Sequence, residues 1–493
     1  MHLDVLGFPL WLRITHFCNF LFLTLLIRSG IQILSDHPKL YWNDHCYPGS
    51  EWLKFGKRDL PTRALWTSMD EAVDVSPVIA LPGQRHALGA GRHWHFLPMV
   101  FWLINGFIYI TLLFCTGNWR RLVPTSSTII PRALHDMATY MTLHKPPLSE
   151  FQPYDALQQL VYFSVVFVLT PLTILSGIAM SPALEARFPW YANVFRGQQK
   201  ARSLHFLCMV SYVLFLIVHV TMVFVVHFKN SAMNITLGGD EGGSFPVALA
   251  LFFGGILLVI ALNWLATAFT RKNPRAVQNL SIALIEPIKR LLFRRLDNVQ
   301  EYTESEISPY FRVNGRPPET EEYLDMMQKN FLNYKLRIFG LVENPVELSL
   351  EDLRELPRQS YTTKHVCIQG WTAIGQWAGV ELSEILKLCN PLPNAKRIYF
   401  HSFQLDPHGR AYYTSLDLDE CEKERTILAY EMNHQSLPME HGAPLRLRCE
   451  TKLGFKMCKW IRSIEVVASI KDVGLGQGGY REDYQYYGTE STI

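Results

Sequence analysis

The sequence contains 493 residues with a formal net charge of +3, 48% apolar residues and 13% aromatic residues. This length leaves room for two or three domains. The small net charge, and the lack of a basic run with interleaved aromatic residues, argue against a nucleic-acid-binding protein. Long uncharged runs lie before about residue 270, and charged residues crowd the rest. The composition therefore predicts a first part embedded in a membrane and a globular second part.

Five apolar stretches are long enough to cross a hydrocarbon layer of roughly 30 Å as helices. They cover residues 11–34, 94–114, 157–180, 203–227 and 247–268. The first stretch lacks a basic leading region and a small-residue cleavage site, so we interpret it as a retained span rather than a signal peptide. A polar, proline-punctuated segment separates the first two spans and is expected to lie outside the membrane.

The remainder of the chain predicts a linker and a second domain. The partly apolar stretch SIALIEPIKRLLF predicts an amphipathic helix that lies on the bilayer or packs on the next domain. From about residue 304, short apolar runs alternate with turn signals such as NPLPN and with a few helical pieces. We therefore expect a transmembrane α-helical bundle at 1–235, a fifth helix and linker at 236–303, and a mixed α+β domain at 304–493.

Four histidines within the predicted spans are candidate metal ligands, because an ionisable side chain inside a membrane is costly unless it has a function. His16 lies near the start of the first span, His95 opens the second, and His205 and His219 lie on the fourth. The last two are 14 positions apart, which puts them within roughly 40° of one helix face and about 21 Å apart along the axis.

The first two spans run antiparallel, so His16 and His95 lie at opposite faces of the membrane. His95 can then pair with His205, and His16 with His219, which predicts two stacked bis-histidine haem b sites. His93 is the alternative to His95, and each histidine could instead be a lone polar residue bonded to a neighbouring helix. The nine cysteines include no CxxC or CxxCH motif, so covalent c-type haem and iron–sulfur clusters are unsupported.

The membrane half resembles a known family in the stretches RITHF, GRHWHF and RSLHF and in YFSVVFVLTPLTILSGIAMSP. These are similar to the di-haem cytochrome b subunits of nickel-iron hydrogenases, formate dehydrogenases and thiosulfate reductases, over roughly residues 8–235. The resemblance implies that quinone or quinol exchanges electrons near one haem.

In the second half, Cys367 lies in KHVCIQGWTAIGQW, where a strand-like run meets a glycine turn that could expose a thiol to a bound cofactor. Softness favours a cysteine thiolate as a ligand of molybdenum held by a pterin dithiolene. A single buried cysteine is, however, more often inert packing. The motif CIQGW, the pattern W-x-GV-x-L at 377–382 and the run HGAPLRLRCETKLGFKMCKWIRSIEVV resemble the molybdopterin domain of the sulfite oxidase family, especially its bacterial methionine-sulfoxide-reductase-like branch.

This second resemblance covers about residues 305–485 and implies a role for each matching residue. Cys367 would bind molybdenum, Arg446 and Lys459 would hold the pterin phosphate, and His441 stands where the reductase branch has asparagine. Tyr412 and Tyr413 would line the substrate side. The remaining expected cofactor contacts are Phe311, Arg312, Asn314, Ser402, Met457 and Cys458.

Together the two halves predict a membrane-bound oxidoreductase in which quinol reduces two b haems and then a molybdopterin centre, which reduces a small S- or N-oxide. The alternatives are a sulfite-type oxidation that delivers electrons to quinone, and a haem-only protein with a cofactor-free docking domain. We expect a multi-pass protein of the bacterial inner membrane that contacts lipid. A homodimer is one possible oligomeric state. The resemblance implies a periplasmic catalytic domain, although Lys and Arg gather on its side of the spans, which favours the cytoplasm.

Overall fold

The computed structural model of the chain describes residues 7–56, 65–144, 146, 154–181, 184, 187–226, 228–239, 243–293 and 300–488. The chain forms two compact units. The helical unit comprises Met1–Gly30, Trp94–Ile178 and Ala201–Lys272. The sheet-rich unit comprises Ile31–His93, Ala179–Lys200 and Asn273–Ile493. This grouping follows compactness rather than sequence order, and the three successive domains expected from the sequence stay a prediction.

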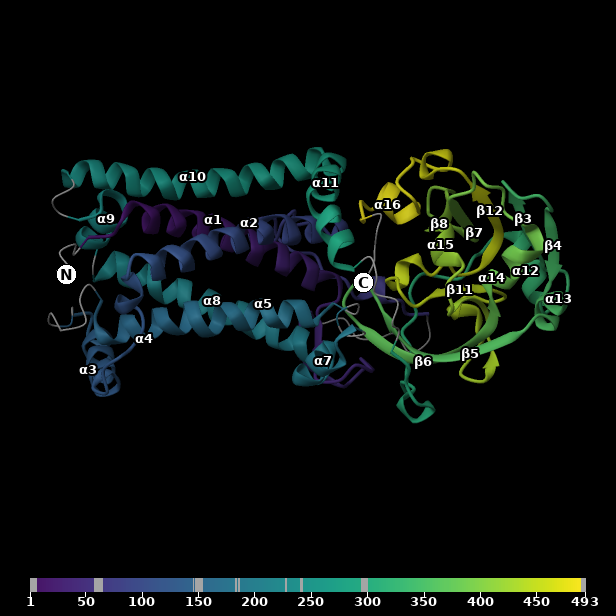
Figure 1. The fold of residues 1–493 in the computed structure, drawn as a ribbon, viewed down its shortest axis with the longest axis horizontal. Helices are drawn as coiled ribbons and strands as arrows, with labels where there is room; N and C mark the ends of the chain where they lie inside the picture. The colour runs from purple at the N-terminus through teal and green to yellow at the C-terminus, as the bar shows by residue number, and fades with distance from the viewer. Residues whose placement is uncertain are drawn as a thin grey trace. The chain divides into compact units, whose positions relative to one another are not determined.

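Five helices are long and apolar enough to cross a membrane, as the sequence predicted: Leu10–Asp36 (α1), Leu88–Cys115 (α2), Ala156–Ala179, Gln198–Val225 (α8) and Phe245–Lys272 (α10). The third consists of α4 (Ala156–Ser164), a π-helical turn η3 (Val165–Leu169) and α5 (Thr170–Ala179). They run alongside one another in Figure 1. The second and fourth begin several residues earlier than expected, and residue 227, the expected end of the fourth, lies outside the described residues.

Polar side chains fasten these helices to one another inside the helical unit. Arg28 on α1 donates to the backbone oxygen and the side-chain oxygen of Asn263 on α10, both at 3.0 Å. On α2, Trp102 donates to Asn19 of α1 at 2.7 Å, and on α5 Thr170 lies 2.7 Å from the hydroxyl of Tyr212 on α8. Such bonds matter between spans because lipid gives apolar helices little reason to associate. They fix which faces of the helices meet.

Shorter helices complete both units: α3 (Ile129–Met141), α7 (Pro189–Phe195), α9 (Phe228–Leu237) and α11 (Pro274–Phe293). The predicted amphipathic helix is α11. Its residue Gln278 donates to the backbone oxygens of Glu482 at 3.0 Å and Tyr487 at 2.6 Å, near the C-terminus. Of the two expectations for this helix, the structure therefore shows packing on the following domain.

The sheet-rich unit contains two five-stranded sheets, which confirms the mixed α+β domain. One has the order β10-β9-β6-β5 with β11 beside β9, and the other has the order β4-β3-β12-β7-β8. All neighbours are antiparallel except the parallel pair β3 and β12. The strands of the first sheet are β5 (Arg358–Val366), β6 (Thr372–Glu381), β9 (Thr426–Met432), β10 (Gln435–Ser436) and β11 (Arg446–Cys449). Those of the second are β3 (Lys335–Gly340), β4 (Val346–Ser349), β7 (Arg397–Leu405), β8 (Ala411–Asp417) and β12 (Ile461–Val467).

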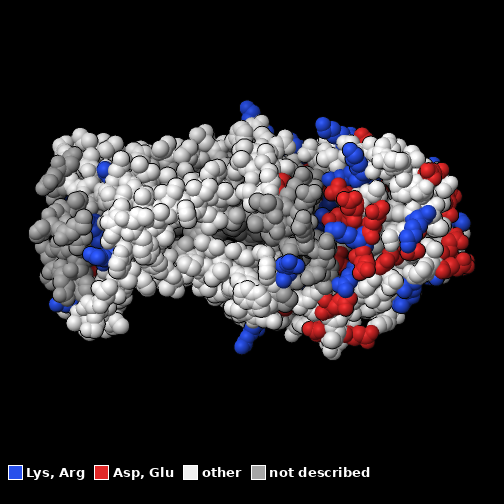
Figure 2. Space-filling model, viewed as in Figure 1, with Lys and Arg blue, Asp and Glu red and all other residues white. Residues whose placement is uncertain are grey.

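Helices α12 (Glu321–Gln328), α13 (Leu350–Glu355), α14 (Leu382–Cys389), α15 (Leu418–Cys421) and α16 (Tyr480–Tyr484) accompany the two sheets. Alternating apolar positions of both sheets form one core, in which Leu336, Ile338, Ile398, Phe400 and Ile464 are fully buried. Figure 2 shows Lys, Arg, Asp and Glu over the sheet-rich unit and mostly uncharged residues over the helices. This distribution matches the charge split in the sequence.

The segment 31–93, which runs from the last turns of α1 to the first turns of α2, belongs to the sheet-rich unit. It forms a two-stranded sheet of β1 (Lys39–Tyr41) and β2 (Glu51–Lys54). Its buried Glu71 forms ion pairs with Arg312 and with Lys39, whose Nζ lies 3.0 Å from Oε1. His37 Nδ1 lies 3.0 Å from the other carboxylate oxygen. Side chains from two segments of the unit, 31–93 and 273–493, thus share one buried carboxylate.

We predict that Glu71→Gln lowers the free energy of unfolding of the sheet-rich unit by about 3 kcal/mol, because it leaves buried Arg312 and Lys39 without their counter-ion. Thermal unfolding of the detergent-solubilised chain at pH 7 would measure the loss. Glu322→Gln is the control, since its pair with Arg462 is more than half exposed and contributes little.

The pH dependence of this loss follows from the pKa of Glu71. Burial alone would raise that pKa, but His37, Arg312 and Lys39 hold it below its usual value. A depressed carboxyl pKa stabilises the fold above the unfolded pKa and loses that effect as the pH falls. The difference between wild type and Glu71→Gln should therefore shrink below about pH 4. A difference that stayed constant into acid would contradict the ion-pair explanation.

Candidate functional site

The four histidines of the helical unit meet in two pairs. The ring centres of His16 on α1 and His219 on α8 are 6.3 Å apart. Those of His95 on α2 and His205 on α8 are 6.2 Å apart. Two imidazoles bonded at about 2.0–2.1 Å to opposite sides of one metal ion would place their ring centres roughly 6.3 Å apart. The geometry fits the pairing expected from the sequence.

The second ring nitrogen of three of these histidines has a polar neighbour. His95 Nδ1 lies 3.1 Å from Ser29 Oγ, and His219 Nδ1 lies 3.5 Å from the hydroxyl of Tyr162. His205 Nδ1 lies 3.1 Å from the carbonyl oxygen of Thr173, which requires a proton on Nδ1. Such contacts leave Nε2 free to bind a metal and orient the ring.

His93, the alternative to His95, lies in the sheet-rich unit. Its Nε2 is 2.9 Å from the carbonyl oxygen of Tyr486, and its ring is buried. An imidazole held in this way has a structural role in the sheet-rich unit. The structure therefore brings together His95, and not His93, with the other ligand candidates.

Cys367 lies in the loop of the hairpin formed by β5 and β6, where Val366 pairs with Thr372. Its amide donates to the carbonyl oxygen of Trp371, and the amide of Gly370 donates back to the carbonyl oxygen of Cys367. Gly370 has a φ of +103°, a conformation that only glycine adopts readily. This closed loop explains the spacing of the CIQGW motif and fixes the direction of the thiol.

The thiol of Cys367 is buried, with side-chain amides on two sides. Asn314 Nδ2 donates to the sulfur at 3.7 Å, and the thiol donates to Gln369 Oε1 at 3.7 Å. Burial raises the pKa of the thiol to about 12. The group is therefore protonated at neutral pH unless a metal ion takes the place of the proton.

A polar pocket of about 70 Å³ lies between the edges of the two sheets. Cys367 does not itself line this pocket, but its partner Asn314 does. The other cofactor and substrate contacts expected from the sequence all line it: Phe311, Arg312, Ser402, Tyr412, Tyr413, His441, Arg446, Met457, Cys458 and Lys459. Residues from distant parts of the sequence thus converge on one site beside Cys367.

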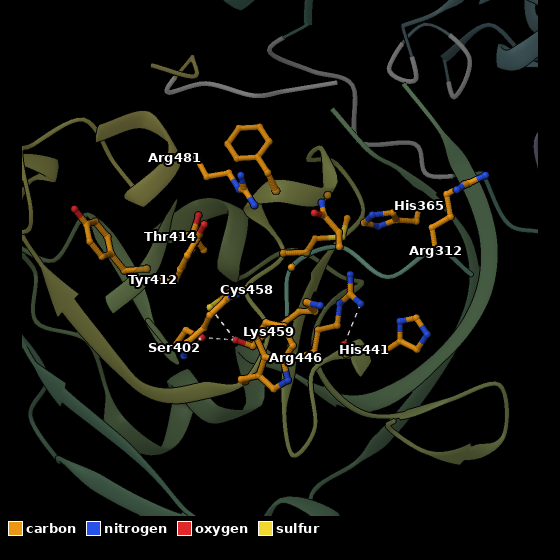
Figure 3. Close-up of a pocket in the computed structure, with 18 of the residues that line it drawn as sticks. Arg312, His365, Ser402, Tyr412, Thr414, His441, Arg446, Cys458, Lys459 and Arg481 are labelled. Atoms are coloured by element: carbon orange, nitrogen blue, oxygen red, sulfur yellow. Dashed lines mark hydrogen bonds between the residues drawn. The ribbon is translucent and has the colours of Figure 1, made fainter. Parts of the chain in front are cut away.

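Three cationic side chains of the pocket have no carboxylate partner among the described residues: Arg446, Lys459 and Arg481. Arg446 donates to the carbonyl oxygen of His441 at 3.0 Å, and Lys459 to that of Glu440 at 2.8 Å. In Figure 3, Arg446 and Lys459 lie close together and Arg481 lies across the pocket from them. Burial and the positive charge of its neighbours lower the pKa of Lys459 well below its usual value.

The same positive charge acts on the two histidines of the pocket. Burial, together with Arg446 and Lys459, lowers the pKa of His441 to about 3. Burial, together with Arg448 and Arg446, lowers the pKa of His365 well below its usual value. Both imidazoles are therefore neutral at physiological pH. The one carboxylate among the described residues that line the pocket, Glu482, is paired with Lys456.

The residues present fit molybdopterin, whose phosphate is an anion. Among the described residues, the buried polar atoms Asn314 Oδ1, Thr414 Oγ1 and Arg446 Nε have no hydrogen-bond partner. Leaving such atoms unpaired costs about 1–3 kcal/mol each. A bound phosphate would accept hydrogen bonds from Arg446 and Lys459, and a soft thiolate of Cys367 suits molybdenum.

Several predicted residues make contacts that the sequence did not reveal. Arg312 lines the pocket, but its guanidinium donates to Glu71, to Cys46 O and to the hydroxyl of Tyr41. Ser402 donates to the backbone oxygen of Lys459 at 2.8 Å and so positions that residue. Tyr412 packs on Tyr480, with ring centres 4.0 Å apart. Tyr413 donates to the carboxylate of Asp483.

The sequence prediction missed His365, Trp371 and Arg481, which also line the pocket. His365 precedes Cys367 by two residues, so strand alternation could have placed it on the same face. A side chain at Gly454 would clash with the His365 ring, because a Cβ there would lie 2.2 Å from it. No local motif indicates Arg481, since it joins the pocket only through the position of α16.

Comparison with known proteins is consistent with both sites. Residues 7–236 match the family of prokaryotic cytochrome b561, and residues 323–472 match the oxidoreductase molybdopterin-binding domain. The chain therefore joins a cytochrome b561 domain to an oxidoreductase molybdopterin-binding domain. It is consequently a membrane-integral protein, and these families imply haem b and molybdopterin as its cofactors.

Three relatives illustrate the likeness. The chain is 32% identical over 185 residues to the putative protein-methionine-sulfoxide reductase subunit YedZ1 of Azospira oryzae, covering 38% of this chain and 64% of the relative. It is 32% identical over 148 residues to the protein-methionine-sulfoxide reductase catalytic subunit MsrP of Campylobacter jejuni, covering 28% and 50%. It is 29% identical over 167 residues to the sulfite oxidase of Arabidopsis thaliana, covering 28% and 42%. The chain thus spans less than two thirds of the length of these curated relatives.

We predict that His16→Ala and His219→Ala each remove the same haem, because either change leaves one iron with a single protein ligand. The absorbance of the b-type bands per chain should fall by about half in each variant, and the double variant should lose no more. Reduced-minus-oxidised spectra of purified protein measure this. His135→Ala on α3, whose side chain is 70% exposed, is the control; additive losses in the double variant would contradict the pairing.

We also predict that Arg446→Gln weakens retention of the pterin about tenfold or more, since a charge-assisted hydrogen bond contributes about 1.5–3 kcal/mol. Molybdenum per chain and pterin fluorescence after gel filtration report the loss. Arg462→Gln, which removes an exposed arginine outside the pocket, should retain both. Full retention of molybdopterin by Arg446→Gln would exclude this arginine from the phosphate site.

Proposed function

We propose that this protein passes electrons from quinol through two b haems to a molybdopterin centre that reduces a small S- or N-oxide. The observation that carries the proposal is the presence of both electron-handling sites in one chain. The helical unit holds two histidine pairs at ring distances of 6.3 and 6.2 Å, and the sheet-rich unit holds Cys367 beside a cationic pocket.

Two haems follow from the way α8 carries one member of each pair. His205 and His219 lie 14 residues apart on this helix, which separates the two irons by about 21 Å along its axis. A second haem at that spacing extends electron transfer across the bilayer thickness of roughly 30 Å. Quinone in the lipid is then the diffusible partner that a membrane-embedded haem reaches.

The side chains of the pocket determine how the molybdenum centre is held. When bound, molybdopterin supplies two-electron oxygen-atom transfer. Cys367 would bind the metal, and Arg446 and Lys459 would hold the phosphate of the pterin. Asn314, which donates to the Cys367 sulfur at 3.7 Å, orients the thiolate and stabilises its charge. The neutral imidazoles of His365 and His441 supply hydrogen bonds without adding charge.

Reduction of an S-oxide has the support of the relatives named as protein-methionine-sulfoxide reductases. The relative named as a sulfite oxidase supports a second candidate, in which a sulfur oxyanion is oxidised and electrons flow to quinone. An unpaired cation such as Arg481 suits an anionic substrate of that kind. Direction depends on the potentials of haem and molybdenum, which contacts around each metal tune.

We place the protein in the bacterial inner membrane with the catalytic unit in the periplasm, as the resemblance implies. The excess of Lys and Arg on that side of the spans favours the opposite orientation. A homodimer is a further possibility to be tested by mass in detergent. Protease digestion of intact spheroplasts decides the orientation, because it degrades the catalytic unit only if that unit faces outward.

We predict that Cys367→Ala abolishes turnover and leaves the haem spectrum unchanged. The change removes the molybdenum ligand in one unit without altering the histidines of the other. The measurement is reoxidation of quinol-reduced haem after addition of a sulfoxide, followed at the b-type bands. Cys389→Ala, which removes another buried thiol, should reoxidise its haem as the wild type does.

Each outcome separates the candidates. Reoxidation by sulfoxide in wild type only supports the reductase, whereas haem reduction by sulfite supports the oxidase direction. If Cys367→Ala matches wild type, molybdenum is not the site of turnover and the second unit acts as a docking domain.

A further inference from the structure

A second, smaller pocket lies beside Cys367 in the sheet-rich unit, and we name it the Cys367 recess. Gln369 and Asn314, whose side chains contact the Cys367 sulfur, both line it. Its other lining residues are Asp36, Met69, His86, Ile368, Phe455, Arg481, Gln485 and Tyr487. The first three come from the segment 31–93, far from the molybdopterin-binding match at 323–472.

Asp36 is the unusual group of the recess. Its side chain is 3% exposed, and its Oδ2 has no hydrogen-bond partner among the described residues. The charged groups near it are Arg85 and Arg481, and the titratable groups near it are His86, Tyr487 and Cys367. No ion pair within 4 Å joins Asp36 to Arg481 in the part of the chain that the structure describes. Burying a carboxylate oxygen without a hydrogen-bond partner is costly. Its presence here therefore suggests a function.

The size of the recess limits what it can contain. Its volume is about 10 Å³, which is close to the space that one water molecule needs. Polar groups on several sides would supply the hydrogen bonds that such a water requires. His86 is exposed and lines the same recess, so the recess has an ionisable group in contact with solvent.

Either direction of the proposed reaction must move protons at the site. Reducing a sulfoxide breaks the sulfur–oxygen bond, consumes two electrons from quinol and two protons, and forms one sulfide and one water. The reverse reaction, oxidation of a sulfur oxyanion, takes its oxygen from water and releases two protons. The larger pocket is also lined by the carboxylate Glu482, but that group forms a buried ion pair with Lys456.

We propose that Asp36 is the proton relay of the molybdenum site, exchanging protons with solvent through the water-sized Cys367 recess and His86. This inference rests on the proposed oxygen-atom transfer but holds for both directions. A relay can act through one water rather than by direct contact. Asp36 would take up a proton from the His86 side of the recess and release it on the Cys367 side, and the direction would reverse when the substrate is oxidised.

The decisive variant is Asp36→Asn, which keeps the shape of the side chain and removes its ability to carry a proton. Reduced-minus-oxidised infrared spectra should lose the carbonyl stretch of one protonated carboxylic acid. Turnover should fall by about 100-fold, with a changed pH profile and unchanged molybdenum and haem content. Asp36→Glu should restore part of the turnover and a shifted infrared band.

Two further variants make the test robust. His86→Gln should slow turnover, and added imidazole should restore it, which a structural role would not produce. Asp325→Asn, an exposed carboxylate paired with Lys329 on α12, should match wild type in spectrum and rate. If Asp36→Asn loses molybdenum, rescue of His86→Gln by imidazole still tests whether protons pass through the recess. That variant leaves Asp36 and the metal ligand in place.

The outcomes distinguish this inference from the proposed function. A wild type that turns over, with Asp36→Asn retaining its rate, pH profile and infrared band, would overturn the relay alone. An absence of imidazole rescue in His86→Gln would remove the route through His86. A wild type that turns over neither sulfoxide nor sulfite, although loaded with molybdenum, would refute the proposed function instead.

Discussion

The sheet-rich unit depends on one buried carboxylate, that of Glu71. It neutralises Arg312 and Lys39 at once, and Trp66 Nε1 donates to it at 3.0 Å. Without such a partner, two buried cations would each carry a large desolvation cost. The shared carboxylate therefore holds the segment 31–93 against the irregular stretch around Arg312, which lines the larger pocket. The same segment supplies Asp36 and His86 to the Cys367 recess.

In the larger pocket, by contrast, some of the described cations lack carboxylate partners. Arg446, Lys459 and Arg481 have no carboxylate partner among the described residues. Burial, together with the positive charge of Arg446 and Lys459, lowers the pKa of both nearby imidazoles. Repulsion among these cations lowers the stability of the free protein, and an anion that binds there restores it through mass action. Cofactor binding and stability of the unit are thus linked. The ring of Trp377 also stabilises the positive charge through cation–π contacts. The guanidinium of Arg446 lies 4.6 Å from the ring centre, and that of Arg448 lies 4.4 Å from it.

In the helical unit, the candidate metal ligands are aligned by helix geometry and by polar contacts between the spans. One helix, α8, supplies a histidine to each pair, so its regular rise sets their separation. Polar bonds such as Arg28 to Asn263 fix the rotation of the neighbouring helices. Small contacts at Nδ1 of His95 and His205 then orient the rings. Spacing comes from the backbone, and alignment comes from packing.

The sequence alone determined the five spans, the mixed α+β domain and the candidate residues of both sites, because hydrophobic length, strand and turn signals and the CIQGW motif are local properties. The sequence also predicted that His205 and His219 lie on one face of their helix, because the geometry of an α-helix determines the direction of each side chain from its position. The sequence did not reveal the roles of Arg312 and Arg481, the burial of Asp36 or the unit to which segment 31–93 belongs. These depend on long-range contacts such as Arg312 with Glu71, 241 residues apart, and no local pattern encodes which distant side chain completes a buried charge. Only the tertiary structure decided them, because the free energy of a buried polar group depends on neighbours from the whole chain.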